Sequence, residues 1–262
     1  MHKARKRARF RIYLITEKTD KEETTMFVIY AHRGASEYYP ENTVTSFSAG
    51  VDMGANGIET DVQISKDGVL MIYHDDSTKE KIGFEGTIAD YTYEELRAAR
   101  MKNEKYSRED CLMTFEDFLK YFAWRDLTLA IELKVRGIAG KVIEMLKKYD
   151  AYDKSIITSF YYDALEEARA YDKDVKIGWL YVKHTAATIE KLHKIGACQA
   201  CPKAEDIKPE HLEALYSEGF ECRAWGIANT DIMKYAVDIG VNGGMTVNFP
   251  DKLARYMKEK NG

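Results

Sequence analysis

The 262-residue sequence predicts a single (β/α)8 barrel of the TIM type, and three observations support this fold class. Short apolar runs alternate with helical periods from residue 27 to the end of the chain. Eight strand–helix pairs follow one another within about 235 residues, and this number of pairs in this length is typical of such a barrel. Glycine or proline stands at many of the joints. A doubly wound open sheet is the alternative, but it usually has fewer repeats at this length.

The barrel elements are expected in a strictly alternating order. The eight expected strands are residues 27–31, 57–64, 127–133, 154–159, 175–181, 197–201, 220–226 and 241–247. The eight expected helices are residues 42–53, 114–123, 138–149, 161–171, 185–195, 208–218, 230–239 and 250–259.

Two segments between the second strand and the second helix do not fit the repeat. The apolar run 69–74 follows the turn sequence at 66–68, so we expect it to extend the second strand region rather than to form a unit. Residues 75–113 are polar and charged. We interpret them as a short polar insertion on the active-site face of the barrel, with a short helix at 92–101.

The first 26 residues form a separate segment of basic and mixed charge. They hold eight Lys or Arg and four Asp or Glu, and Met26 directly precedes the first apolar strand. We expect this extension to lie outside the fold, with residues 27–262 forming one catalytic barrel. A basic arm for a membrane surface or nucleic acid is the alternative interpretation.

Composition limits the function classes. Apolar residues make up 45% of the chain and charged residues 31%, which is typical of a globular protein. The net charge of −4 argues against nucleic-acid binding by the whole domain. No apolar run approaches the ~20 residues of a membrane helix, and no secretory signal is present. We therefore expect a cytoplasmic protein without stable membrane insertion; nothing in the sequence indicates its oligomeric state.

Polar side chains stand at the ends of the first strands, where a parallel barrel places its functional residues. These sequences are His32-Arg33-Gly34, Glu59-Thr60-Asp61, His74-Asp75 and Glu132-Leu133-Lys134. Side chains two positions apart project to the same side of a strand. Glu59, Asp61 and Glu132 are therefore expected to converge at one mouth and to form an oxygen cage for Mg²⁺ or Ca²⁺. Lys134 and Arg33 add the positive charge that a phosphoryl oxygen needs.

His32 and His74 form a second pattern in the same place. Two imidazoles beside one reacting centre can serve in turn as base and acid. A single histidine at a strand end is more often structural, and Glu132 with Lys134 could be a structural ion pair. All of these residues occur together at the ends of the first three strand regions, and this favours a catalytic site.

These motifs resemble the glycerophosphodiester phosphodiesterase family, and the resemblance extends from Phe27 to Leu253. Its hallmarks here are Ala31-His32-Arg33-Gly34-Ala35, Pro40-Glu41-Asn42-Thr43, Glu59/Asp61, His74/Asp75, Glu132/Lys134, Ala224-Trp225 with Asn229, and Asn248-Phe249-Pro250-Asp251. The chain departs from the family pattern in Gly226-Ile227-Ala228 after the tryptophan, in Gly243-Gly244 and in Asn248. These departures affect the substrate pocket rather than the core chemistry.

The resemblance implies a TIM-like barrel that hydrolyses glycerophosphodiesters to glycerol 3-phosphate and an alcohol with one divalent cation, Mg²⁺ or Ca²⁺. It also implies the roles of the residues. The metal ligands would be Glu59, Asp61 and Glu132; the acid–base pair would be His32 and His74; phosphate or substrate would contact Arg33, Lys134 and Trp225; and Glu41 and Asn42 would support the site.

The family also implies that the neighbouring glycerol hydroxyl attacks phosphorus and that water then opens a cyclic phosphate. From the residues alone, direct attack by water and either assignment of the two histidines remain open.

Two other functions are compatible with such a barrel. A phospholipase D-like activity on lysophospholipids or sphingolipids would need an apolar, membrane-facing rim, and residues 75–113 contain no long apolar run. A non-catalytic barrel that binds a phosphate ligand would be expected to have lost part of the metal or histidine set. The sequence retains the whole set.

Overall fold

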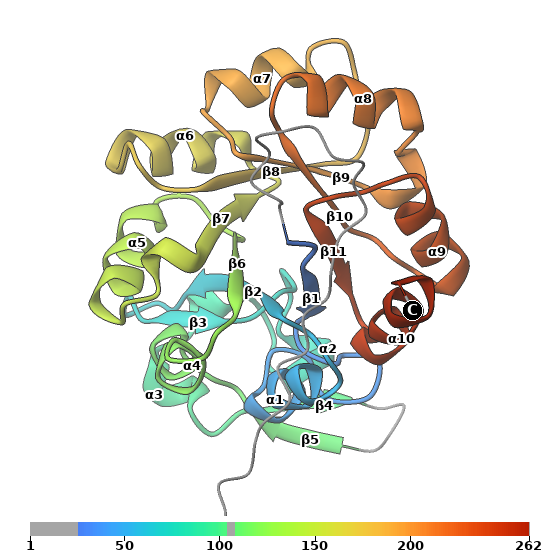
Figure 1. Cartoon of the computed structure of the whole chain (residues 1–262). Coiled ribbons are helices and arrows are strands. Elements are labelled where there is room, and N and C mark those ends of the chain that lie inside the picture. Colours follow the sequence, from blue (N-terminus) through green and yellow to red (C-terminus); the bar gives the residue numbers. More distant parts are fainter. Residues whose placement is uncertain (1–25, 104–107, 262) are drawn as a thin grey trace, which may run out of the picture.

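The computed structural model describes residues 26–103 and 108–261, and a closed parallel barrel lies at its centre (Figure 1). The barrel strands are β1 (Ile29–His32), β2 (Gly57–Ile64), β6 (Thr128–Leu133), β7 (Ser155–Ser159), β8 (Ile177–Tyr181), β9 (Gln199–Pro202), β10 (Glu221–Ala224) and β11 (Gly244–Val247). They pair in the order β1-β11-β10-β9-β8-β7-β6-β2, and β2 pairs with β1 to close the ring. The predicted (β/α)8 fold is confirmed. The predicted extension, residues 1–26, lies outside the described residues except for Met26.

An outer ring of helices surrounds the strands (Figure 1). These helices are α1 (Val44–Asp52), α4 (Phe115–Phe122), α5 (Ala139–Lys148), α6 (Tyr162–Tyr171), α7 (Thr188–Lys194), α8 (Pro209–Ser217), α9 (Thr230–Asp238) and α10 (Pro250–Asn261). Local signals fix several of their starts. Thr43, Thr114 and Asn229 are N-caps whose side chains accept backbone N–H bonds in the first turn.

The segment between β2 and α4 forms a small subdomain of its own. β3 (Leu70–Ile72) pairs antiparallel with the end of β2, as expected for an extension of that strand. The insertion contains α2 (Lys79–Ile82), a 3₁₀ turn (Ile88–Asp90), α3 (Tyr93–Leu96), and the antiparallel pair β4 (Arg100–Asn103) and β5 (Arg108–Cys111).

The predicted helix 92–101 is therefore wrong over much of its length. It makes one turn after the Thr92 cap and ends at Leu96. The chain then becomes β4 because it pairs with β5, and Met101 is fully buried beside Leu96 in the subdomain's own apolar cluster. Long-range pairing here overrides the local helical pattern.

The two-residue period of the strands separates the apolar core from the site. Ile58 and Val62 of β2 pack in a large apolar cluster with residues of α4, α5 and α6. Glu59 and Asp61, which alternate with them, therefore project into the barrel. The same alternation in β6 places Glu132 inside the barrel.

The interior of the barrel is polar as well as tightly packed. Arg223 of β10 is 1% exposed, and its guanidinium lies 5.0 Å from the ring centre of Tyr30. Its Nε donates to Gln199 Oε1 at 2.8 Å and its Nη1 to Thr246 Oγ1 at 2.9 Å. This network forms a floor that joins β1, β9, β10 and β11 below the mouth of the barrel.

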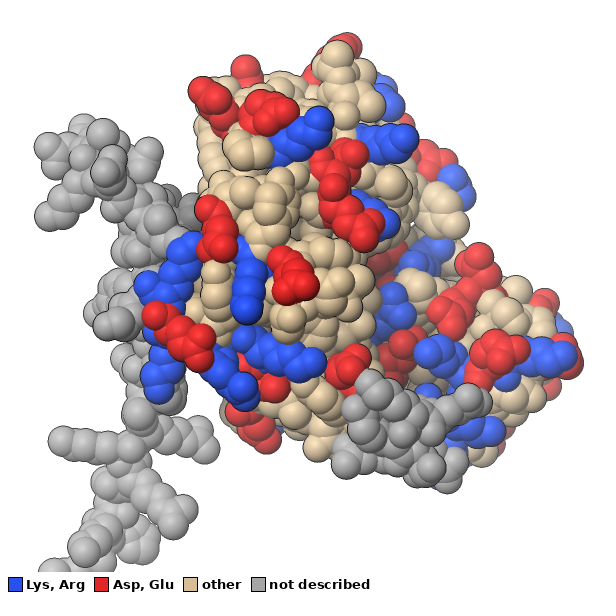
Figure 2. All heavy atoms as spheres, turned by 90° about the vertical axis from the view of Figure 1, so that its right-hand side faces the viewer, with Lys and Arg blue, Asp and Glu red and all other residues tan. Residues whose placement is uncertain are grey.

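Within the described part of the chain, no helix is long and apolar enough to cross a membrane. On the face that includes α9 and α10, basic and acidic side chains lie next to one another (Figure 2). The expected cytoplasmic location stays a prediction.

Candidate active site

Three buried carboxylates meet at the mouth of the barrel. Glu59 and Asp61 come from β2 and Glu132 from β6, where Asp61 and Glu132 lie opposite each other in the strand register. One oxygen from each carboxylate lies within 4.8 Å of one oxygen from each of the others. All three residues are at most 6% exposed. The structure thus brings the three predicted metal ligands together.

These carboxylates are incompletely satisfied by the protein. Glu59 Oε2 and Asp61 Oδ1 are buried without a hydrogen-bond partner among the described residues. Lys134 Nζ donates to Glu132 Oε1 at 2.9 Å but lies 4.0 Å from Asp61 Oδ1. Arg33 Nε lies 3.3 Å from Asp61 Oδ2. Buried oxygens without partners are costly, so the cluster fits an added cation.

The pKa values of these carboxyl groups indicate that the site has too little positive charge to balance them. Burial raises the pKa of Glu59 well above its usual value, and the charges of Asp61 and Glu132 raise it further. Burial and Asp61 also raise the pKa of Glu132. Burial opposes ionisation of Asp61 too, but Arg33 and its other cationic neighbours hold the pKa of this carboxyl below its usual value. A hard divalent cation among oxygen ligands would stabilise all three carboxylates in their charged form.

The loop after β1 fixes Arg33 and Asn42 in the site. Both residues have left-handed backbone angles, with φ of 54° and 58°. Asn42 is fully buried; its Nδ2 donates to Asp61 Oδ2 at 2.9 Å, and its Oδ1 accepts from Thr60 Oγ1 at 3.0 Å. Arg33 Nη1 donates to Glu41 Oε1 at 3.3 Å. Asn42 and Glu41 thus hold a metal-ligand candidate and the arginine in place, as supporting residues would.

The same loop depends on one glycine. Gly34 has φ of 88°, and a Cβ at this position would lie 2.3 Å from the backbone of Ser46 in α1. No other residue fits this close approach between the loop and the helix.

His32 stands at the end of β1 with a defined tautomer. Its Nδ1 lies 2.5 Å from Asn248 Oδ1, which can only accept a hydrogen bond, so Nδ1 carries the proton. Nε2 is left with a lone pair and lies 3.9 Å from Glu59 Oε2. Burial and the charge of Arg33 lower the pKa of His32 to about 3, so its imidazole is neutral near pH 7.

His74 follows β3 and has an acidic partner. Its Nδ1 lies 2.6 Å from Asp75 Oδ1, and this hydrogen bond lowers the pKa of Asp75. Gln63 Nε2 donates to the backbone carbonyls of Tyr73, His74 and Asp75 at 2.9–3.3 Å, which holds the segment in position. Glu41 approaches His74 and Asp75 closely enough to share an ion with them, but it already pairs with two basic side chains.

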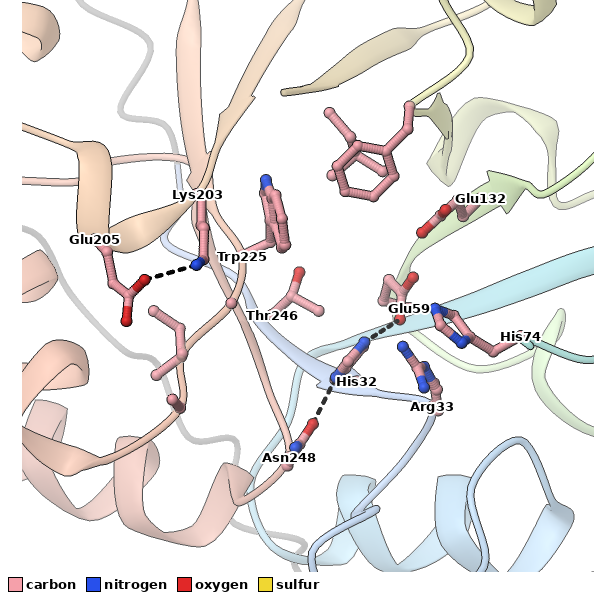
Figure 3. A pocket seen from close by; sticks show the side chains of 15 residues that line it. His32, Arg33, Glu59, His74, Glu132, Lys203, Glu205, Trp225, Thr246 and Asn248 are labelled. Carbon is pink, nitrogen blue, oxygen red and sulfur yellow. Dashed lines mark hydrogen bonds and ion pairs between the residues drawn. The ribbon is translucent and has the colours of Figure 1, made fainter. Parts of the chain in front are cut away.

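A cavity of about 360 Å³ joins these residues to a wall of different character. His32, Arg33, Glu59, His74 and Glu132 line one side (Figure 3). The remaining lining residues are Phe160, Leu180, Lys203, Glu205, Trp225, Gly226, Ile227, Ala228, Thr246 and Asn248. The volume lies within the range of small-molecule sites.

Two predicted substrate residues are placed differently from Arg33. Lys134 is not among the residues that line the cavity; it contacts Glu132 and Asp61 from beside it. Trp225 lines the cavity, but its Nε1 donates to the backbone carbonyls of Tyr181 and Cys201 at 3.2 and 3.0 Å. Its indole N–H is therefore occupied, and the ring surface is what it offers to a ligand.

Three charged residues of this region were not predicted from the sequence, namely Arg223, Lys203 and Glu205. Polar side chains at strand ends indicated the site residues of the first strands, and the same signal is present here. Lys203 directly follows β9, and Glu205 comes two residues later. No comparable signal indicates Arg223, because a basic residue within a short strand does not reveal which neighbours surround it.

The chain is similar to known proteins over most of its length. A model of the glycerophosphoryl diester phosphodiesterase family matches residues 32–252. The glycerophosphodiester phosphodiesterase of Caldanaerobacter subterraneus subsp. tengcongensis is 31% identical over 243 residues, covering 88% of this chain and 98% of that protein. The glycerophosphodiester phosphodiesterase of Bacillus altitudinis is 29% identical, covering 89% and 99%.

Solved structures give the same picture of the fold. A glycerophosphodiester phosphodiesterase from Thermotoga maritima superposes with a TM-score of 0.71 at 26% identity, covering 89% of this chain and 98% of that one. A phosphodiesterase from Oleispira antarctica, in complex with the product sn-glycerol-3-phosphate, superposes with a TM-score of 0.80 at 23% identity, covering 88% and 96%.

Proposed function

Because the chain belongs to the glycerophosphoryl diester phosphodiesterase family, we propose that it hydrolyses glycerophosphodiesters to glycerol 3-phosphate and an alcohol with the help of a divalent cation. One observation carries the proposal beyond family membership. Three buried carboxylates with two partnerless oxygens form one cluster, and two of them line one cavity together with two histidines and an arginine. Phosphodiester cleavage requires such groups: ligands for a cation, an acid and a base, and positive charge beside the phosphate.

Glu59, Asp61 and Glu132 would hold Mg²⁺ or Ca²⁺, the cations that prefer oxygen ligands. When bound, the cation would supply Lewis-acid stabilisation of the charge on the phosphoryl oxygens. Arg33 lines the cavity and offers guanidinium donors to the phosphate. Lys134 remains in its ion pair with the carboxylates and balances their charge.

The contacts of the two histidines favour different roles. His32 presents the lone pair of Nε2 and acts as the base that takes the proton of the attacking hydroxyl. His74 donates Nδ1–H to Asp75, which orients its ring, and His74 acts as the acid that protonates the leaving alcohol. The attacking oxygen forms a bond to phosphorus as the bond to the alcohol oxygen breaks.

In keeping with the family, the attacking group is the glycerol hydroxyl next to the phosphoester. It yields a cyclic phosphate, and water opens this ring with the two histidine roles reversed.

The test is the release of choline and glycerol 3-phosphate from glycerophosphocholine. We expect both products in equal amounts, loss of activity in EDTA, and recovery with Mg²⁺ or Ca²⁺. Glu132→Gln should be inactive, whereas Glu144→Gln, a change on the exposed face of α5, should behave as wild type. Full activity after exhaustive chelation would contradict the metal-dependent part of the proposal.

A second candidate is hydrolysis of lysophospholipids. One observation favours it: Phe160 and Val182, which follow the carboxyl ends of β7 and β8, remain 39% and 50% exposed and could contact an acyl chain. Release of choline from lysophosphatidylcholine at a higher kcat/KM than from glycerophosphocholine would make it the better assignment. The non-catalytic alternative is disfavoured because the carboxylates and both histidines lie together.

A further inference from the structure

The wall of the cavity opposite the carboxylates carries two charged side chains that the proposed chemistry does not use. Lys203 and Glu205 follow β9 and line the cavity, and Lys203 Nζ lies 2.6 Å from Glu205 Oε2. Their side chains are 35% and 51% exposed, so a ligand can reach both. Figure 3 shows the pair beside Trp225, across the cavity from Glu132 and His74.

This wall is held in a defined position by the backbone. Residues Lys203 and Trp225 form a parallel bridge, and the backbone N–H of Lys203 donates to the carbonyl of Tyr181. The methylene stem of Lys203 lies over Gly226, where an added Cβ would come within 3.2 Å of Lys203 Cγ. The glycine, with φ of 71°, therefore leaves the space that the lysine occupies.

The chemistry of the wall matches a ligand with several hydroxyl groups. A lysine ammonium has three donors, of which Glu205 takes one, and Glu205 Oε1 has further acceptor capacity. A hydroxyl group both donates and accepts, so neighbouring hydroxyls can bond to both members of the pair. Lys203 would repel a cationic group and Glu205 would repel an anionic group, so neither kind of ligand is favoured over a neutral polyol.

The aromatic part of the wall suits the carbon skeleton of the same ligand. Phe160 and Trp225 pack edge to face with ring centres 4.8 Å apart. Because the indole N–H is occupied by backbone carbonyls, Trp225 presents an apolar surface next to the ion pair. C–H groups of a polyol can pack on such a surface while its hydroxyls reach the charges.

We propose that Lys203, Glu205 and Trp225 form a polyol subsite that determines substrate specificity, an inference that rests on the proposed function. Lys203 donates to one hydroxyl, Glu205 accepts from a neighbouring hydroxyl, and the carbon chain packs on Trp225. The polyol has two chemical sources in a glycerophosphodiester: the glycerol common to all of these substrates, or a head group that is itself a polyol.

The test compares Lys203→Met and Glu205→Gln with wild type on three phosphodiesters. These are glycerophosphocholine, glycerophosphoglycerol and 2-hydroxypropyl 4-nitrophenyl phosphate, which keeps one hydroxyl to attack phosphorus and has no further hydroxyl for the subsite. Loss of a charged hydrogen bond should lower kcat/KM by roughly 10- to 100-fold. A glycerol subsite predicts this loss on both glycerol-containing substrates, and a head-group subsite predicts it on glycerophosphoglycerol alone. Cleavage of 2-hydroxypropyl 4-nitrophenyl phosphate should be unchanged in either case.

Matched controls are Lys208→Met and Glu210→Gln, which change exposed residues at the start of α8 outside the cavity lining. Both should retain wild-type kcat/KM on all three substrates. Unchanged kcat/KM of the Lys203 and Glu205 variants on both glycerol-containing substrates would overturn the subsite, as would an equal loss on 2-hydroxypropyl 4-nitrophenyl phosphate. A wild-type protein that cleaves neither glycerol-containing substrate would overturn the proposed function, and the subsite with it.

Discussion

The carboxylates at the barrel mouth and those on the outer helices differ in how they are paired. Burial and like charge raise the pKa of Glu59 and Glu132. On the outer ring, hydrogen bonds from neighbouring lysines lower the pKa of Glu116 and Asp172 to about 2. The outer acids are satisfied by the fold itself. The mouth holds more acidic charge than its own cations satisfy, which is the state of a site built for a ligand.

The mouth also contrasts with the rest of the barrel in what it contributes to stability. Apolar residues that alternate with the site residues pack against the helices and stabilise the fold. Buried carboxylates that repel one another work against it. Strained or unsatisfied groups persist where a binding site requires them. Substitutions of the carboxylates at the mouth should therefore lower activity without lowering stability, whereas substitutions on the outer ring should lower stability without lowering activity.

The largest effect is expected for the double variant Glu59→Gln/Glu132→Gln. It removes two of the three carboxylates, and a Lewis-acid cation contributes several kcal/mol to catalysis, so kcat should fall by roughly 10⁴-fold. Calorimetric titration with Mg²⁺ or Ca²⁺ should show no saturable site. The metal-free variant should melt at or above the wild-type temperature, because two repelling charges are gone. A clear drop in its melting temperature would contradict this comparison.

The next largest effect is expected for His32→Ala and His74→Ala. Each should lower kcat by roughly 10²- to 10⁴-fold, the usual contribution of general acid–base catalysis, with little change in metal affinity. The double variant should lose less than the product of the two single effects. A nitrophenyl leaving group needs no protonation, so it should partly rescue His74→Ala and not His32→Ala. Rescue of His32→Ala alone would reverse the proposed roles.

An intermediate effect is expected at Asn42, which supports Asp61 from a left-handed backbone position. Asn42→Ala loses two buried hydrogen bonds and leaves at φ of 58° a residue that tolerates the left-handed region less well than asparagine, so it should destabilise the protein by about 2–4 kcal/mol. Asn42→Gly loses the same bonds but tolerates the backbone, so it should be more stable than the alanine variant. The two variants should have similarly reduced activity. Equal unfolding free energies in urea would show that the backbone is not strained.

Much of the fold and the site can be predicted from local sequence patterns. The periodicity of strands and helices, and the polar residues at strand ends, depend only on residues that are neighbours in the sequence. Glu59 and Asp61 illustrate this: one spacing places both inside the barrel. The bond of His32 to Asn248 joins residues 216 positions apart, and local pattern does not show it. Arg223 meets its partners only when β1, β9 and β11 assemble around it. The β4–β5 pair was missed for the same reason, since its helix-like sequence is overruled by pairing.

The smallest effect is expected for Asp172→Asn on the outer ring. Asp172 Oδ2 lies 2.7 Å from Lys147 Nζ, and this bond holds the pKa of Asp172 at about 2, below its usual value near 4. A depressed pKa contributes stability above pH 4 that is lost as the pH falls toward 2. The variant should therefore be less stable by under about 1 kcal/mol at pH 7, since solvent screens the pair, and the difference should vanish only below pH 2, where Asp172 is protonated in the folded state as well. Urea unfolding at a series of pH values measures this, with the exposed Asp153→Asn as the control. Activity should be unchanged throughout, and any loss of kcat would show that the outer ring and the mouth are coupled.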